Sequence, residues 1–463
     1  MEEAKVIPQK RPASEAPEKE QTPLKQHHYS TRSTTASHDN DKQIVPRLKP
    51  LPYTTQDLYN ELKPPHKIEI INLLPLANGK VFYTTEDHPF NRRGFKYTPC
   101  RPNPYLKSLM YSTTDLPPYD VRISYFDRSQ GCYMDDQMKA ITTDQGWRTA
   151  RTNIGLREGN YYMEFKILRA NDFNENDCHV RIGIGRKEAS MEAPIGFDGY
   201  GYGLRDKTGQ KLHLSRPVEF MKGGFRTGDV IGMLVELPSL DIQRKICDLQ
   251  IKNKIKSDPC EVTLDGNSEI EYDKDIVRDQ IPIKYKSQLY FEQYEYTPTT
   301  RMQHLLNPVT VFGEKAIPDK DKFKPAILPN SKLSFYKNGE FVGTAFENLY
   351  CFLPPNSEQS QNPIISSLKG KHSKLGNDAD SFPVVHDDGS LGYYPMLSCF
   401  KNGCVEINPG PNFECISDES LKQKLADNQI KSLSERYNEK VVEDIVFDII
   451  DEIESEYLDA LEA

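Results

Sequence analysis

The fold is decided by one stretch of sequence, GWRTARTNIGLREGNYYMEFKI at residues 146–167, which contains the only tryptophan of the chain. Its second half opens a run, YYMEFKILRA at 161–170, in which apolar and polar side chains alternate. A Gly-Asn pair precedes this run and an Asn-Asp pair follows it. Alternation with a period of two, bounded by turn residues, is typical of a β-strand that buries one face.

Similar short strands follow toward the C-terminus. HVRIGIGR (179–186) alternates, whereas DVIGMLVEL (229–237) is almost continuously apolar, which indicates a strand buried on both faces. Further strands are predicted at 287–295, 332–346 and 392–400. An Asn-Gly pair divides two aromatic runs within 332–346, and this predicts a type I′ hairpin. Because no helical pattern lies between these strands, the sequence predicts a mainly β fold, an antiparallel β-sandwich.

Composition divides the chain into segments. Hydrophobic residues make up 37% of it, below the roughly 45–50% usual for globular chains, so polar segments dilute a real core. We expect a disordered polar tail at 1–60, a segment with a basic and aromatic motif at 61–118, the β domain at 119–415 with surface insertions at 240–282 and 354–391, a linker at 416–437 and a helix at 438–460.

Charge and hydropathy single out the C-terminus. The net charge of −9 equals the charge of the stretch that begins at Glu443, which has nine acidic residues and no Lys or Arg. The rest of the chain is balanced, which argues against a globally basic nucleic-acid-binding surface and leaves only local basic patches. Ser432 with Glu435 matches a capping box that opens this helix or an earlier turn. Apolar residues recur at the spacing of an amphipathic α-helix, at Val442, Ile445, Val446, Ile449, Ile450, Ile453 and Tyr457.

The sequence offers no recognisable catalytic or metal motif. No G-x-S-x-G or H-E-x-x-H occurs, and the glycines of 183–185 and 199–203 do not fit a phosphate-binding βαβ unit, so we interpret them as turn glycines. The nine cysteines form no C-x-x-C pair, which predicts reduced thiols in the cytosol or nucleus and no zinc site. Neither a membrane span nor a signal peptide is expected. We therefore predict no catalytic residue, no metal and no cofactor.

Five motifs in order together resemble a SPRY domain, a bent β-sandwich that binds peptides through loops on one edge. They are the stretch 146–167, VRIGIGR (180–186), GFDGYGYGLRD (196–206), GDVIGMLVEL (228–237) and FYKNG (335–339). Four more segments are similar to the SPRY subunit of COMPASS-type histone methyltransferase complexes, the Ash-two/Bre-two family. They are EDHPFNRRGFKY (86–97), KYKSQLYFEQ (284–293), VEINPGPNF (405–413) and VVEDIVFDIIDEIESE (441–456).

This resemblance implies a function and its partners. It implies a nuclear, non-catalytic scaffold that binds a WD-repeat subunit through the SPRY surface and a Dpy-30-like dimer through the C-terminal helix. Together these would stimulate a SET-domain methyltransferase that acts on lysine 4 of histone H3 in the nucleosome. Two other classes of protein are alternatives. A substrate-recognition subunit of a ubiquitin ligase should carry a RING, B-box, SOCS or LisH segment, and a free-standing enzyme should carry a polar catalytic cluster; neither is recognised.

The resemblance also implies residues for the WD-repeat contact. In the family an arginine just before the R-x-G turn holds an acidic, sometimes phosphorylated, segment of that partner, and here it is Arg151. A second basic position falls on the following strand at Arg181. A guanidinium fork suits carboxylate or phosphate. The alternative is that both are ordinary surface arginines on strand edges. If the contact is real, Arg151→Ala should abolish partner binding and leave the fold intact.

Two further contacts remain open between alternatives. The Dpy-30-like dimer would cover the helix stripe Val442, Ile445, Val446, Ile449, Ile450 and Ile453, unless the helix packs this stripe on its own domain. The basic segment Arg92, Arg93 and Lys96, with its neighbouring aromatics, could contact nucleosomal DNA. Equally, this segment could pack its aromatic residues on the β domain.

Overall fold

The computed structural model describes residues 51–85, 95–107, 110–170, 177–251, 276, 278, 280–294, 303–306, 325–353 and 387–462. Most of the predicted polar tail and residues 354–386 of the second predicted insertion lie outside these ranges. Of the first predicted insertion, helix α2 (Leu240–Ile251), residues 276 and 278, and the segment from residue 280 onward are described.

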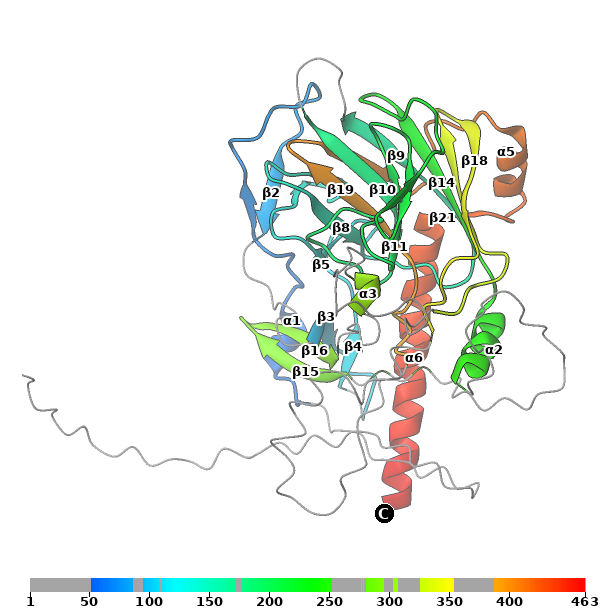
Figure 1. Cartoon of the computed structure of the whole chain (residues 1–463). Coiled ribbons are helices and arrows are strands. Elements are labelled where there is room, and N and C mark those ends of the chain that lie inside the picture. The colour runs from blue at the N-terminus through cyan, green and yellow to red at the C-terminus, as the bar shows by residue number, and fades with distance from the viewer. Residues whose placement is uncertain are drawn as a thin grey trace, which may run out of the picture.

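The body of the molecule consists of two mainly antiparallel sheets that face each other (Figure 1). The ten-stranded sheet has the order β1 (Lys67–Glu69), β2 (Phe82–Thr85), β6 (Tyr133–Asp135), β7 (Ala140–Thr142), β20 (Cys404–Asn408), β9 (Gly159–Arg169), β14 (Val230–Leu237), β17 (Lys332–Lys337) and β18 (Glu340–Glu347), with β21 (Lys431–Ser432) parallel to β9. The seven-stranded sheet has the order β13 (Arg216–Val218), β12 (Lys211–His213), β11 (Gly201–Arg205), β10 (His179–Gly185), β19 (Tyr394–Phe400), β8 (Arg148–Thr152) and β5 (Ile123–Arg128).

A smaller four-stranded sheet lies beside this sandwich. Its order is β15 (Ile281–Tyr285), β16 (Gln288–Tyr294), β3 (Phe95–Pro102) and β4 (Tyr111–Thr113), so it joins a segment that precedes the main domain to one that lies between β14 and β17 in sequence. The described helices are α1 (Thr55–Tyr59), α2, α3 (Gln303–Leu306), α5 (Glu419–Ala426) and α6 (Leu433–Glu462). None of the helices in the described ranges is both long and apolar enough to cross a membrane.

The core forms because alternate residues of the central strands point to the same side. Met163 of β9 lies opposite Met233 of β14, and Phe165 lies opposite Ile231, all fully buried. Burial of each such side chain contributes about 1.5–3 kcal/mol. The mainly β sandwich predicted from the alternating runs is confirmed, as is the C-terminal helix.

The strand with the continuous apolar run is covered on both faces, as predicted. One face of β14 lies in the main core, and Leu234 on the other face belongs to a second cluster with Tyr162 and Leu421. Leu421 comes from α5, which lies within the segment predicted as a linker. Asp418 caps this helix by accepting hydrogen bonds from two backbone N–H groups, at 2.8 and 3.3 Å.

The predicted hairpin and capping box are both formed. Asn338 and Gly339 have φ angles of 49° and 87°, and Lys337 pairs directly with Glu340, so a two-residue turn joins β17 to β18. The Ser432 backbone N–H donates to Glu435 Oε2 at 2.6 Å, and the Glu435 N–H donates to Ser432 Oγ at 3.2 Å. This box opens α6 at Leu433, five residues before the expected start of the helix.

Of the glycines interpreted as turn glycines, Gly199 lies in a turn, but the others lie in strands β10 and β11. Gly183 lies inside β10 and Gly203 inside β11, where the two residues face each other across the ladder. A Cβ atom on Gly183 would lie 1.9 Å from the Tyr202 carbonyl oxygen, and one on Gly203 would lie 2.7 Å from that of Ile195. These glycines are therefore required by close backbone approach within the sheet, and the interpretation as turn glycines is wrong for them.

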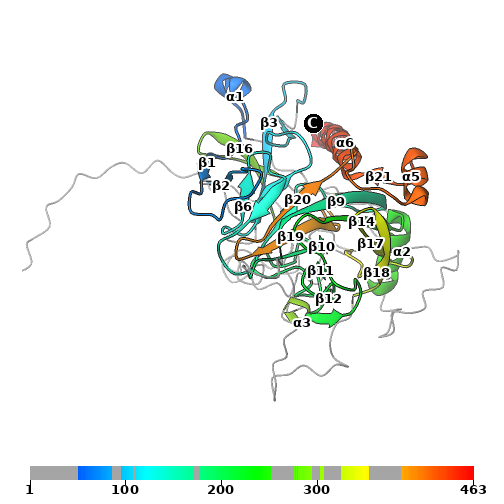
Figure 2. The same ribbon diagram turned by 90° about the horizontal axis from the view of Figure 1, so that it is seen from above.

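Helix α6 is anchored at its start and then leaves the sandwich. Leu433 and Tyr437 are buried in the main core, and the Tyr161 hydroxyl donates to Glu439 Oε2 at 3.0 Å. Beyond this root the helix passes beside the small sheet, and its C-terminal end projects away from the body (Figure 1, Figure 2). The N-terminal part of α6 thus belongs to the domain, and the remainder extends from it.

Candidate partner-binding surfaces

The two arginines expected to bind a partner share one face of the seven-stranded sheet. Strand β19 lies between β8 and β10; Met396 is opposite Arg151 on one side and Gly183 on the other. Arg181 lies two residues from Gly183, so its side chain points to the same face as that of Arg151. Both strands are interior to the sheet. The alternative of surface arginines on strand edges does not describe these positions.

Arg151 is buried beside a carboxylate of its own chain. Only 3% of its surface is exposed, and one Nη2 atom lies 3.9 Å from Asp127 Oδ1. Its Nη1 donates to the Arg186 carbonyl oxygen at 2.5 Å, and its Nε has no hydrogen-bond partner. Burial raises the pKa of Asp127, but Lys187 and Arg151 more than offset this and hold that pKa below its usual range. Arg151 is therefore part of an internal ion network.

Arg181 is also buried, but it has no such counter-ion. It is 8% exposed, with its guanidinium carbon 4.7 Å from the centroid of the Trp147 ring. Its Nη1 donates to the Ile195 carbonyl oxygen at 3.3 Å, and its Nε is unpartnered. Within the described part of the chain, no carboxylate lies within ion-pair distance of this guanidinium. Burial, assisted by Arg205, lowers its pKa to about 10.

The connection from β10 to β11 holds both arginines in place. Arg186 and Ile195, whose carbonyl oxygens accept from the two guanidinium groups, both belong to it. Asp198 fixes its shape by accepting from the Ser190 and Tyr200 N–H groups, and burial raises the pKa of Asp198 to about 6. The arginine face is thus built by a loop that folds back over the sheet.

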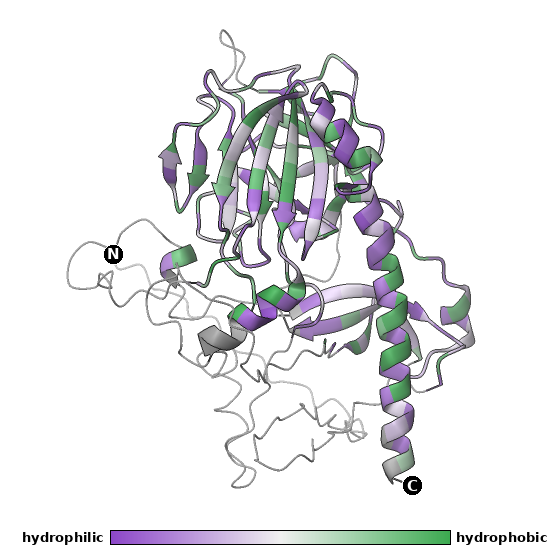
Figure 3. Ribbon diagram, turned by 90° about the vertical axis from the view of Figure 1, so that its right-hand side faces the viewer, coloured by the Kyte–Doolittle hydropathy of each residue, from purple (hydrophilic) through white to green (hydrophobic). Residues whose placement is uncertain are grey.

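The apolar stripe of α6 is exposed along the helix. Figure 3 shows hydrophobic residues on the outer part of α6. The fractional exposures are 59% for Val442, 54% for Ile445, 46% for Val446, 49% for Ile449, 42% for Ile450 and 60% for Ile453. The described residues leave this stripe largely uncovered by the domain, and of its six members Ile445 also lines the cavity between α6 and the body. Contiguous exposed apolar surface of this kind marks an interaction site.

The acidic side of the same helix faces inward. Asp448, Asp451 and Glu452 are buried, and all three come from the run of negative residues at the C-terminus. Carboxylates leave water only when cations and N–H groups replace their hydration. The Lys107 backbone N–H donates to Glu452 Oε1 at 2.6 Å, and Arg278 pairs with the two aspartates. Nothing in the local sequence indicated Arg278, because it lies far from the helix along the chain.

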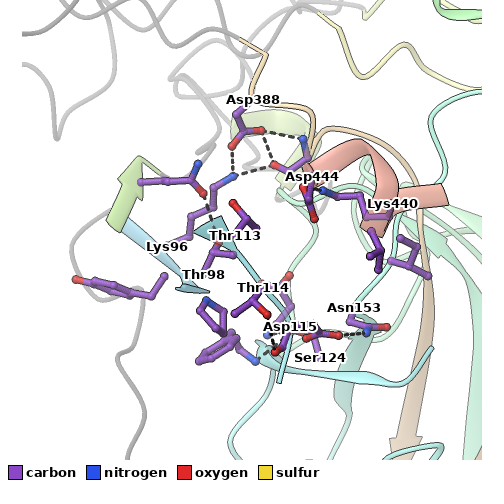
Figure 4. A pocket seen from close by; sticks show the side chains of 18 of the residues that line it. Lys96, Thr98, Thr113, Thr114, Asp115, Ser124, Asn153, Asp388, Lys440 and Asp444 are labelled. Carbon is purple, nitrogen blue, oxygen red and sulfur yellow. Dashed lines mark hydrogen bonds and ion pairs between the residues drawn. The ribbon is translucent and has the colours of Figure 1, made fainter. Parts of the chain in front are cut away.

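The basic segment is only partly described. Arg92 and Arg93 lie outside the described residues. Lys96 lies on β3, where its Nζ is 2.5 Å from Asp388 Oδ2 and 2.8 Å from Ser390 Oγ. Its side chain is 13% exposed and lines an inner cavity, so its charge is already engaged within the molecule (Figure 4).

This cavity lies between the small sheet, the sandwich and α6, and has a volume of about 560 Å³. Its lining contains the ion pairs Lys96 with Asp388 and Lys440 with Asp444 (Figure 4), and also Lys187 with Asp127. Among the residues described, no group of three or more His, Cys, Asp or Glu side chains is arranged to hold a metal ion. The cavity therefore combines ion pairs with apolar side chains at the junction of the small sheet, the sandwich and α6.

Comparison with known proteins identifies the family. The COMPASS component cclA of Colletotrichum higginsianum is 36% identical over 82% of this chain and 70% of that protein. The COMPASS component BRE2 of Saccharomyces cerevisiae is 30% identical over 81% of this chain and 89% of that protein. The chain belongs to this family of COMPASS components. Membership of the Ash-two/Bre-two family, predicted from the motifs, is confirmed.

The COMPASS component family also includes a longer relative. The Set1 complex component ash2 of Schizosaccharomyces pombe is 35% identical over 90% of this chain, which spans only 53% of that protein. No known protein-family model matches the chain. Similar solved structures are SPRY domains. That of human HERC1 has a TM-score of 0.28 and 13% identity, covering 62% of this chain and 94% of its own; another human SPRY domain has a TM-score of 0.27 and 9% identity, covering 61% and 98%.

Proposed function

We propose that this chain is a non-catalytic scaffold subunit of a nuclear COMPASS-type complex that methylates lysine 4 of histone H3. The observation that carries the proposal is the outward apolar stripe of α6 on a helix whose root is built into the sandwich. The names of the relatives, which are components of COMPASS or of the Set1 complex, support it. The ubiquitin-ligase alternative has no support among these names.

The stripe binds a Dpy-30-like dimer by helix-in-groove docking. Its six aliphatic residues lie on one side of α6 and are each at least 42% exposed. Transfer of each such side chain from water into an apolar groove contributes about 1.5–3 kcal/mol, before the cost of association. Because the helix is already formed, little of this free energy is spent on ordering it.

The arginine face binds an acidic segment of a WD-repeat subunit. Arg181 makes the direct contact in this proposal, because it is buried without a counter-ion and stacks on Trp147. A buried charge of this kind is costly unless an anion neutralises it. Arg151 supports the contact from the same face by holding the β10–β11 connection through Arg186. Arg92 and Arg93 stay a predicted contact to nucleosomal DNA.

The scaffold then stimulates the SET-domain subunit by stabilising its active conformation. A reconstituted complex of SET-domain, WD-repeat and Dpy-30-like subunits should methylate histone H3 faster when the full chain is added. The chain alone should transfer no methyl group. The variant Ile449→Glu/Ile453→Glu should lose the dimer, whereas Val218→Glu, at a position 51% exposed on β13, should keep it. Methylation that is indifferent to the chain, or a stripe variant that retains the dimer, would refute the proposal.

A further inference from the structure

One buried arginine pairs with the outer part of α6, in addition to the Lys107 backbone N–H that donates to Glu452. Arg278 is 7% exposed, and its Nη2 lies 2.7 Å from Asp448 Oδ1 and 3.0 Å from Asp451 Oδ2. Its Nη1 lies 3.9 Å from Asp444 Oδ1. We call these four residues the clasp. One guanidinium thus contacts carboxylates on successive turns of the helix.

The arginine is itself fixed from the other side. Its Nη1 donates to Thr113 Oγ1 at 3.3 Å, and the Gln280 side-chain amide donates to the same oxygen at 3.1 Å. Thr113 belongs to β4 of the small sheet. The Phe447 ring lies with its centroid 5.5 Å from the guanidinium carbon. The clasp therefore joins α6 to the small sheet through the end of the predicted insertion at 240–282.

Helix geometry connects the clasp with the exposed stripe. At 3.6 residues per turn, Asp444, Asp448 and Asp451 lie on one side of α6. By the same spacing, Val446 and Ile453 lie almost directly opposite these aspartates. Val442 and Ile450 lie within about a sixth of a turn of that opposite direction. Fixing the acidic side toward the body consequently fixes the apolar side toward solvent.

We propose that Arg278 is a positioning residue that keeps the outer part of α6 helical and turns its apolar stripe toward an incoming partner. The inference rests on the proposed docking of a Dpy-30-like dimer at that stripe. A short helical segment without tertiary packing is marginal in water, because its few backbone hydrogen bonds barely repay the ordering of the chain. A partner that must order the segment itself binds more weakly than one that meets it preformed.

The electrostatics of the clasp agree with this role. Burial raises the pKa of Asp448 to about 6, against the lowering effect of Arg278. The neighbouring charged groups are Asp444, which also pairs with Lys440, and Asp451. Removal of the guanidinium leaves these carboxylates without their shared cation, and buried charges of that kind are expelled toward water. The helix meets that demand by moving away from the small sheet.

The test compares variants of the full chain for binding to a purified Dpy-30-like dimer by calorimetry and for amide hydrogen exchange along α6. Arg278→Ala should weaken binding about tenfold and speed exchange after Asp444. Exchange in the sandwich strands should stay unchanged. Arg278→Lys should restore most of the affinity, because a cation remains. The matched control Arg216→Ala changes an exposed arginine on β13 and should behave as wild type.

The stripe variant Ile449→Glu/Ile453→Glu separates this inference from the proposed function. If it loses the dimer while Arg278→Ala binds and exchanges like wild type, the positioning role is wrong and the docking proposal stands. If the stripe variant still binds the dimer, the docking proposal fails, and the role inferred for Arg278 fails with it. Loss of affinity in Arg278→Ala that Arg278→Lys does not recover would also contradict the clasp.

Discussion

Arg181 stacks on Trp147 with its guanidinium carbon 4.7 Å from the ring centroid, while no carboxylate in the described residues lies within ion-pair distance of it. A buried cation without a counter-ion is unfavourable, and the stacking keeps its planar fork in a fixed orientation. The pair thus leaves a positive site beside the only tryptophan of the chain. An anionic group from a partner can complete this site.

Arg181→Ala should weaken binding of an acidic WD-repeat segment about tenfold to a hundredfold, because charge-assisted hydrogen bonds contribute about 1.5–3 kcal/mol. Calorimetry with a synthetic acidic peptide measures this, and added salt should weaken wild-type binding more than that of the variant. Arg216→Ala serves as the control. Equal affinity of Arg181→Ala and wild type would exclude Arg181 from the contact.

Arg151→Ala should destabilise the fold as well as weaken the partner contact. The sequence alone predicted an intact fold, but Arg151 is buried beside Asp127 and bonded to the Arg186 carbonyl oxygen. Removal of one partner of a buried ion network costs about 3 kcal/mol. Urea unfolding of the wild type, Arg151→Ala and Arg151→Lys measures the loss. An unfolding free energy unchanged in Arg151→Ala would show that Lys187 alone satisfies Asp127.

Gly183→Ala should be strongly destabilising, whereas Gly201→Ala should be tolerated. A Cβ atom at Gly183 would lie 1.9 Å from the Tyr202 carbonyl oxygen, but one at Gly201 would meet nothing closer than 3.4 Å. Overpacking of this severity costs about 3 kcal/mol or more, because the obstacle is backbone and cannot rotate away. Thermal unfolding of the two variants tests this difference. Similar melting temperatures for both would contradict the close approach of the two strands.

His179 should make the folded state less stable as pH rises above its ordinary pKa of 6.5. Its Nδ1 lies 3.0 Å from Asp206 and its Nε2 3.1 Å from Asp177, and the hydrogen bond to Asp206 is the main cause that raises its pKa above the ordinary 6.5. A raised pKa stabilises the folded state below the unfolded-state pKa, and this contribution is lost as pH rises through the folded-state pKa. Unfolding free energies from about pH 6 to about pH 9 should fall more steeply in the wild type than in His179→Gln. Parallel pH profiles would contradict the prediction.

Local sequence patterns predicted the strands, the hairpin and the C-terminal helix. The burial of their polar side chains depends on contacts with residues distant in sequence. The alternation in 161–170, the Asn338-Gly339 pair and the stripe from Val442 each report on neighbouring residues, and each corresponds to an element in the structure. The burial of Arg181 could not be read in this way, because it depends on a loop that folds back so that Ile195 accepts from it. The same holds for the inward acidic side of α6, which depends on Arg278 from a distant segment.

The small sheet could not be predicted from local sequence patterns either. Strand β16 pairs with β3, although nearly two hundred residues separate them. No local sequence pattern could therefore predict the pairing of Tyr290 with Pro99. Helix α5 was not predicted for a different reason. Its apolar pattern around Leu421 is short and lies in a polar stretch, and its position depends on packing against Tyr162.

The placement of two late strands has a consequence for biosynthesis. Strand β19 lies between β8 and β10, and β20 lies between β7 and β9, so each sheet of the sandwich has an interior strand that comes from beyond residue 393. Neither sheet can close until the ribosome has made the chain beyond residue 393. During that time β9 lacks its neighbour β20, and β8 and β10 lack β19, so unpaired strand edges that favour aggregation are exposed. The sandwich and its projecting helix are thus completed almost together, and an unfinished chain offers no binding surface to a partner.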